Sequence, residues 1–217
     1  MIVFDGLNAI QRGNITVLPA EWHTVEDLPE FPIGSCGYER TGMRIAVLDL
    51  HGQEQTPGST GEICVCGPAV FPGYFNNPEA NAKAFHDGWF RTGDLGHLDE
   101  RGFLYITGRL SDMYISGGSN VYPREIEEQI LCHPAIAEVA VLGVPDRQWG
   151  EIGVAIAVCR SGKSCNQDVV LKFLEGKVAR YKMPRRVLFW DELPKSAYGK
   201  VSKKALREVL ATRTAAM

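Results

Sequence analysis

Short apolar stretches separated by turn signals fill the chain from about residue 44 to residue 109. "MRIAVLD" and "EICVCG" are strand-like runs, and the segment "LHGQEQTPGSTG" between them is rich in turn-forming residues. "LGHL" and "FLYIT" form a second pair around the turn "DERG". "NPEANAKAF" predicts a short helix, with Asn77 as its cap and Pro78 at its first position. The pattern therefore predicts mainly antiparallel β-structure over residues 44–109.

Helices and strands alternate after Arg109. "YPREIEEQILCHP" predicts a helix that begins near Pro123, and Asn166 is the expected cap of a second helix, "NQDVVLKFLEGKVA". The apolar side of this second helix is expected to hold Val169, Val170, Phe173 and Leu174. The runs "MYIS", "IAEVAVLGV", "EIGVAIAVC" and "RVLFW" predict strands, and a last helix is expected from Ser202. The fold class is thus α+β, with one domain over residues 1–109 and a compact second domain over residues 110–217.

The composition predicts the solubility and the cellular compartment of the protein. Of the 217 residues, 45% are hydrophobic and 23% are charged, the balance of a soluble globular protein. No apolar run approaches the roughly 20 residues that span a bilayer, and the N-terminus does not resemble a signal peptide, so a cytoplasmic protein is expected. The six cysteines form no CxxC pair. They are therefore interpreted as small buried hydrophobic residues rather than a metal site.

Charge is distributed unevenly along the chain. Residues 1–171 hold 11 Lys and Arg against 22 Asp and Glu, whereas residues 172–217 hold 12 against 4. A basic C-terminal region favours an anionic ligand or a docking surface, and a solvated helix face is the alternative. Nucleic acid is not expected to bind, because the basic run lacks interleaved aromatic residues and no nucleic-acid-binding motif is present.

Several polar residues lie next to glycines, where a ligand can approach the backbone. Lys200 follows a glycine, but "ELPKSAYGKVS" is not a phosphate-binding P-loop, because proline stands where the motif needs its first glycine and valine follows the lysine. Asp94 in "RTGDLG" could accept ribose hydroxyls or cap its own backbone. Arg109 could contact a phosphate or pair with Asp112. Taken one by one, these residues are more typical of surface charges and ordinary turns.

Their order along the chain is far more specific than any single motif. "GWFRTGDLGHLDERGFLYITGRLSDMYISGGSNVYPREIEEQI", "GVPDRQWGE" and "LPKSAYGKVSKKALRE" together closely resemble the acyl-CoA synthetase branch of the AMP-forming, acyl-adenylating superfamily. The resemblance runs from about Ile33 to Leu210. Members of this family join a carboxylate to ATP, releasing pyrophosphate, and then pass the acyl group from AMP to the thiol of coenzyme A. The resemblance implies a distorted β-barrel-like remnant of the large domain, followed by a small mobile α+β domain.

The resemblance also implies roles for individual residues. Asp94 resembles the acid that holds the ribose of ATP and AMP, Arg109 the arginine near the hinge that contacts ribose or phosphate, and Lys200 the catalytic lysine between the substrate carboxylate and the α-phosphate. Ser111 occupies the hinge position, where the family usually has Asp or Lys. The residues expected to contact coenzyme A are Gly117 and Gly118 along its pantetheine arm, Trp149 and Tyr181 at its nucleotide, and Lys182, Arg185 and Arg186 at its phosphates. For the two aromatic residues, core packing is the competing interpretation. "PKSAYGK" also matches the surroundings of lysines that are reversibly acetylated in this family.

Two landmarks of the family are absent from the sequence. These are the Ser/Thr/Gly-rich phosphate loop ending in Pro-Lys and the Tyr-Gly-x-Thr-Glu stretch whose acid helps to bind Mg²⁺, so no metal ligand is expected in this chain. We therefore expect the C-terminal part of a synthetase, inactive by itself, whose acid substrate contacts a missing N-terminal half. The alternatives are a non-catalytic nucleotide-, CoA- or protein-binding module and a module that loads a carrier protein. Exposed apolar surface over residues 30–105 would favour a homo-oligomer.

Overall fold

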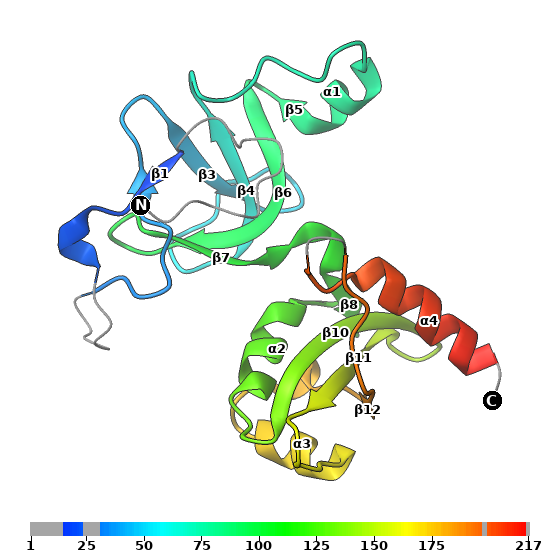
Figure 1. Cartoon of the computed structure of the whole chain (residues 1–217). Helices are drawn as coiled ribbons and strands as arrows, with labels where there is room; N and C mark the ends of the chain where they lie inside the picture. The colour runs from blue at the N-terminus through cyan, green and yellow to red at the C-terminus, as the bar shows by residue number, and fades with distance from the viewer. Residues whose placement is uncertain (1–14, 24–30, 197–198, 216–217) are drawn as a thin grey trace. The chain divides into compact units, whose positions relative to one another are not determined.

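The computed structural model describes residues 15–23, 31–196 and 199–215 (Figure 1). The chain divides into two compact units, Met1–Ser111 and Asp112–Met217, and the division falls within the short 3-10 helix η2 (Leu110–Asp112). Residues 1–14, which precede the family resemblance, lie outside the described residues.

The first unit is built on an antiparallel sheet of five strands. Its order is β3-β4-β6-β5, and β7 also pairs with β6. A small two-stranded sheet, β1 with β2, a 3-10 helix η1 and one α-helix complete the unit. The strands are β1 Thr16–Val17, β2 Tyr38–Glu39, β3 Arg44–Leu48, β4 Gly61–Cys66, β5 Phe85–His86, β6 Trp89–Leu98 and β7 Leu104–Arg109, and the helices are η1 Ala20–Trp22 and α1 Pro78–Ala84. The described strands form open sheets and not a closed barrel, so the coarse expectation of a mixed α+β fold is confirmed while the barrel-like description is not.

One face of the five-stranded sheet carries the core of the first unit. Ile45, Ile63, Val65, Phe90 and Leu104 are buried together there. α1 begins as the sequence predicts, since the Asn77 side chain accepts a hydrogen bond from the Ala80 amide and Pro78 is the first residue of the helix.

The second unit is a five-stranded sheet covered by helices on both faces. β10 and β11 form its long central hairpin, and β11 also pairs with β8 and, in parallel, with β12. The strands are β8 Tyr114–Ser116, β9 Ser119–Val121, β10 Ile136–Asp146, β11 Gly150–Cys159 and β12 Arg186–Phe189, and the helices are α2 Pro123–Leu131, α3 Gln167–Leu174, η3 Arg180–Lys182 and α4 Lys203–Ala215. In Figure 1 the β10–β11 hairpin lies between α2 on one side and α4 on the other.

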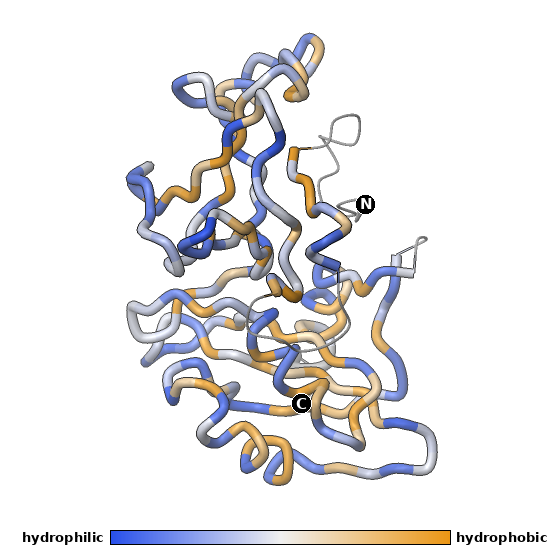
Figure 2. The backbone as a smooth tube through the Cα atoms, turned by 90° about the vertical axis from the view of Figure 1, so that its left-hand side faces the viewer, coloured by the Kyte–Doolittle hydropathy of each residue, from blue (hydrophilic) through white to orange (hydrophobic). Residues whose placement is uncertain are grey.

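Two clusters of buried side chains explain why β10 and β11 read as continuous apolar runs. Val141 and Ala155 face a cluster that includes residues of α2 and α3, whereas Leu142 and Ile156 face a cluster that includes Leu206 of α4. Strands buried on both faces need apolar residues at successive positions, not only at alternate ones. No described helix is long and apolar enough to cross a membrane, and Figure 2 shows apolar segments that are short and interrupted by polar ones.

Candidate functional site

Asp94 and Arg109 lie opposite each other on neighbouring strands of the first unit. They are direct partners in the β6–β7 register, and Arg109 Nε lies 3.1 Å from Asp94 Oδ1. The Asp94 side chain is only 5% exposed, whereas that of Arg109 is 48% exposed. The pair therefore consists of a buried carboxylate with a partly solvated guanidinium at its outer side.

The second oxygen of the Asp94 carboxylate indicates which kind of ligand the site favours. Asp94 Oδ2 is buried and has no hydrogen-bond partner among the described residues. Burial raises the pKa of Asp94 to about 6, although the nearby Arg109 charge acts in the opposite direction. A buried acceptor without a donor is costly, and a ligand that supplies hydroxyl donors would remove that cost.

Side-chain hydrogen bonds help to hold the Asp94 turn, defined here as Thr92–Asp94. Thr92 Oγ1 donates to the Ile63 carbonyl at 2.7 Å and accepts from the Asp94 amide at 3.0 Å. Gly93 has φ +71°, in the region that favours glycine, and its amide donates to Glu62 Oε1 at 3.2 Å. Sequence reasoning missed Glu62; the signal for it is a lone acid in the otherwise apolar strand "GEICVC".

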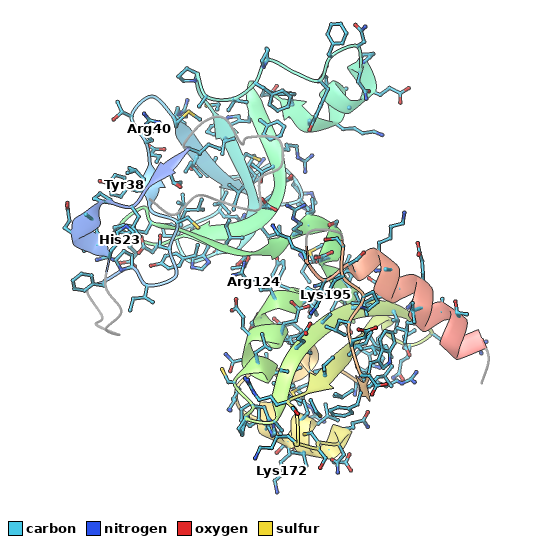
Figure 3. The ribbon with its side chains drawn as sticks, in the orientation of Figure 1. His23, Tyr38, Arg40, Arg124, Lys172 and Lys195 are labelled. Atoms are coloured by element: carbon cyan, nitrogen blue, oxygen red, sulfur yellow. The ribbon has the colours of Figure 1, made fainter. Side chains whose placement is uncertain are left out.

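Lys200 lies in the second unit, between β12 and α4, in a stretch that we call the Lys200 loop, residues 194–196 and 199–202. An isolated β-bridge joins Lys195 to Val201, and the Ser196 amide donates to the Lys200 carbonyl at 2.7 Å. Lys195, labelled in Figure 3, is held by Glu138 through a 2.8 Å contact between Nζ and Oε1. The Lys200 side chain is exposed, so a ligand can reach it.

A half-buried cation, Lys203, anchors the C-terminal end of this loop. Lys203 Nζ lies 2.8 Å from Glu127 Oε1 and 3.5 Å from Asp112 Oδ2, and its side chain is only 17% exposed. Glu127 also accepts the Val141 amide at 2.8 Å. This cluster joins the start of α4 to α2, to β10 and to Asp112. Asp112 directly follows Ser111, the proposed hinge residue, which is exposed in η2. Sequence patterns did not indicate this cluster, because its members are far apart in the chain.

The glycine pair of the second unit turns the β8–β9 hairpin beside Trp149. Gly117 and Gly118 have φ of +56° and +80°, and the Gly117 amide donates to the Trp149 carbonyl at 2.9 Å. A Cβ on Gly117 would lie 2.8 Å from Trp149 Cε3, whereas one on Gly118 would meet open space. Arg185 lies over the Trp149 ring, with 5.0 Å from Cζ to the centroid. The structure therefore brings Gly117, Trp149 and Arg185 together.

The remaining predicted residues of the basic region have more varied surroundings. Tyr181 is 52% exposed, and Lys182 beside it is bound by both carboxylate oxygens of Glu125 at 2.7 and 2.8 Å. Burial alone would lower the pKa of Lys182, but the hydrogen bonds and charge of Glu125 raise it. Figure 3 shows Lys172 at the opposite end of the second unit from Lys195, so the basic residues of this region are spread over its surface.

No group of three or more His, Cys, Asp or Glu among the described residues could hold a metal ion. Of the cysteines, Cys64 is fully buried and Cys132 is exposed, so they do not all behave as the small buried residues expected from the sequence. Burial raises the pKa of the Cys64 thiol to about 12, and the Glu62 charge adds to this effect.

Comparison with known proteins identifies the relatives of this chain. The family model described as "AMP-binding enzyme" matches residues 15–75, and "AMP-binding enzyme C-terminal domain" matches residues 125–200. Indoleacetate–CoA ligase of Aromatoleum aromaticum is 46% identical over 181 residues, covering 83% of this chain and 36% of the ligase. The chain thus spans about a third of the length of the curated relatives it matches.

Two solved structures agree with this result. ATP-bound MatB from Rhodopseudomonas palustris gives a TM-score of 0.77 at 43% identity, over 84% of this chain and 37% of that one. The o-succinylbenzoate coenzyme A synthetase MenE of Bacillus subtilis, in complex with ATP and magnesium ion, gives a TM-score of 0.78 at 36% identity, over 92% and 39%.

Proposed function

Because the chain belongs to the AMP-binding enzyme family, we propose that it is the C-terminal part of an AMP-forming acyl-CoA synthetase. In the first half-reaction a carboxylate oxygen attacks the α-phosphorus of ATP, forming acyl-AMP and releasing pyrophosphate. In the second, the thiol of coenzyme A attacks the acyl carbon, AMP leaves, and the thiol proton is released. The first unit would be the last part of the large domain, and the second unit the mobile domain, with Ser111 at the hinge.

The observation that carries this proposal is the Asp94 carboxylate with its unpartnered oxygen. Ribose offers two neighbouring hydroxyl donors, which is the ligand chemistry that a buried carboxylate with a free acceptor requires. Arg109, paired with Oδ1 and half exposed, can keep Asp94 ionised and still donate to a ribose or phosphate oxygen. The pair thus suits a nucleoside monophosphate better than an uncharged ligand.

Lys200 is assigned the catalytic role by its position in the family motif and its exposure. An ammonium group between the substrate carboxylate and the α-phosphate would reduce the repulsion between two anions and stabilise charge that develops on the attacked phosphoryl group. Mg²⁺ would reduce the charge of the ATP phosphates, and none of its ligands is assigned to this chain.

Coenzyme A is assigned to the surface around Gly117, Trp149 and Tyr181. Trp149 is 39% exposed and already carries Arg185 on its ring, so an adenine and a phosphate could bind side by side there. The Gly117–Gly118 turn lets a narrow chain pass close to the backbone, because Gly118 has open space where a side chain would stand.

Calorimetric titration of the purified chain with AMP tests the proposal. Binding to the wild type that is lost in Asp94→Asn but kept in Asp87→Asn supports it. Asp87 is a matched control, since it is an acid of the same unit whose side chain is 86% exposed. AMP that binds equally to Asp94→Asn, or that does not bind to the folded wild type, contradicts it.

A ligation assay tests the proposal that this 217-residue chain is inactive by itself. The sequence contains no Ser/Thr/Gly-rich phosphate loop, so the triphosphate of ATP lacks its usual cradle. With saturating ATP, Mg²⁺, coenzyme A and a panel of fatty and aryl acids, we expect no acyl-CoA. Clear thioester formation would contradict this expectation.

A further inference from the structure

Glu62 is a buried acid on β4 that the proposed reaction does not use. Only 6% of the residue is exposed, and burying a carboxylate is costly unless it is paired and hydrogen-bonded. Arg91 Nε donates to Glu62 Oε2 at 2.8 Å, and a second nitrogen of the same guanidinium also contacts Oε2. The hydrogen bond to Glu62 raises the pKa of Arg91. One oxygen of Glu62 is thus committed to Arg91.

The other oxygen of Glu62 binds the turn that carries Asp94. Gly93 donates its amide to Oε1 at 3.2 Å, directly before Asp94 in the chain. The β4–β6 register is irregular here: Glu62 is opposite Leu95 and Cys64 is opposite Arg91, so β6 contains two more residues than β4 across this interval. Residues 92–94 therefore leave the regular β4–β6 pairing, although Asp94 stays opposite Arg109 of β7, and the side chains of Glu62 and Thr92 supply hydrogen bonds on the β4 side.

We propose that Glu62 is a positioning residue of the nucleotide site, which fixes the Thr92–Asp94 turn so that the Asp94 carboxylate stays buried against Arg109. The expected effect of Glu62 on nucleotide binding rests on the proposed function. The positioning of Asp94 by Glu62 does not depend on that function. Gly93 has no Cβ, so its backbone can adopt its φ of +71° and other conformations that are unfavourable for residues with a side chain. A glycine before a functional carboxylate therefore needs an external restraint, and Glu62 supplies it.

The surroundings of Glu62 and Arg91 explain why loss of the Glu62 carboxylate would affect the Thr92–Asp94 turn. Glu62 and Arg91 line a cavity of about 620 Å³ in the first unit, together with Arg44 and Trp89. The Arg91 side chain is 43% exposed. Without the carboxylate, water from this cavity could reach the Gly93 amide, and that amide would lose its hydrogen bond to Glu62. The cations paired with Glu62 and Asp94 are Arg91 on β6 itself and Arg109 on β7.

The direct test is the titration of Asp94 in the whole chain, followed by carboxyl NMR in the wild type and in Glu62→Gln. Glutamine keeps the volume of the side chain, but it cannot serve Arg91 and Gly93 with two acceptor oxygens. We expect the pKa of Asp94 to fall from about 6 toward its ordinary 3.8 in the variant, because the carboxylate becomes hydrated. Glu54→Gln is the control: Glu54 lines the same cavity and is exposed, but makes no described contact with the turn.

Each outcome decides the inference. A lower melting temperature with an unchanged Asp94 titration would mean that Glu62 only stabilises the sheet, which overturns the proposal. If Glu62→Gln does not fold, Glu62→Asp, which keeps the charge but draws the carboxylate back from the Gly93 amide by one methylene, must show the same direction of shift, and an unchanged titration there also overturns the proposal.

AMP binding separates this inference from the proposed function. If the wild type binds AMP, Glu62→Gln should bind it at least about tenfold more weakly, a loss of ~1.4 kcal/mol. If the wild type does not bind AMP, the proposed function fails, while the NMR titration still decides whether Glu62 positions Asp94.

Discussion

Replacing the Asp94 carboxylate by an amide should make the first unit more stable at neutral pH. Asp94 is ionised at pH 7, yet its side chain is only 5% exposed and one of its oxygens has no hydrogen-bond partner among the described residues. Asparagine has nearly the same shape and keeps an oxygen for Arg109, but it carries no charge that burial would penalise. Arg109 is half exposed, so water can solvate its guanidinium in the variant.

The size of the effect follows from the pKa of Asp94. Burial raises the pKa from 3.8 to about 6, so the folded state holds the proton more tightly than the unfolded state, and the wild type loses stability as the pH rises through this interval. The full cost above pH 7 is about 3 kcal/mol, since each pKa unit corresponds to about 1.4 kcal/mol. At pH 5 about half of that cost is already present, so the advantage of Asp94→Asn should grow by about 1.4 kcal/mol between pH 5 and pH 8.

Urea unfolding of the two proteins at pH 5, 6, 7 and 8 measures this difference. The unfolding free energy of Asp94→Asn minus that of the wild type should rise with pH and level off above about pH 7. Glu100→Gln, at an exposed acid of the same unit, should show no such trend. A difference that is constant over this range, or that falls with pH, would refute the reasoning that burial dominates the Asp94 site.

Three further predictions concern the second unit. Gly117→Ala should lower the unfolding free energy by about 1–3 kcal/mol and change tryptophan fluorescence, because its Cβ meets Trp149, whereas Gly118→Ala should leave the fluorescence unchanged; equal spectra would contradict this. Lys203→Met should cost about 1–2 kcal/mol in urea unfolding at pH 7, since two half-buried carboxylates lose their cation, and the exposed Lys204→Met should cost almost nothing. Asn166→Ala should cost about 1 kcal/mol by removing the cap of α3, and Asn166→Asp should restore most of it.

Local signals in the sequence were sufficient to predict most helices and strands, but not to predict where each one ends. Asn77 and Asn166 cap α1 and α3 as predicted, because a cap depends on residues only three positions apart. The predicted second helix extends too far, since α3 ends at Leu174 and Gly176 adopts a φ of +74°. Val169 was expected on the buried side but is 45% exposed, because α3 packs along the line of Val170 and Leu174.

Pairing between distant segments could not be predicted from these patterns. Asp94 and Arg109 were recognised separately, and only the β6–β7 register makes them partners. Asp112 lies close to Lys203, which is 91 positions away in the numbering, and no local pattern indicated this contact. Glu62 was missed for the same reason: its function depends on an irregular register with β6, not on its own neighbours in sequence.

The parallel pairing of β11 with β12 also has a consequence for how the protein is made. Residues 154–157 of β11 are buried and apolar. They pair with β10 on one side and with residues 186–189 of β12 on the other. During synthesis the β10–β11 hairpin can close as soon as it leaves the ribosome, but this edge stays open until the segment after α3 has also emerged. An open apolar strand edge is a template for association with other chains, so in the growing polypeptide this stretch is where a chaperone would be needed most. A growing chain from which β11 has emerged but β12 has not would therefore expose this edge to other chains.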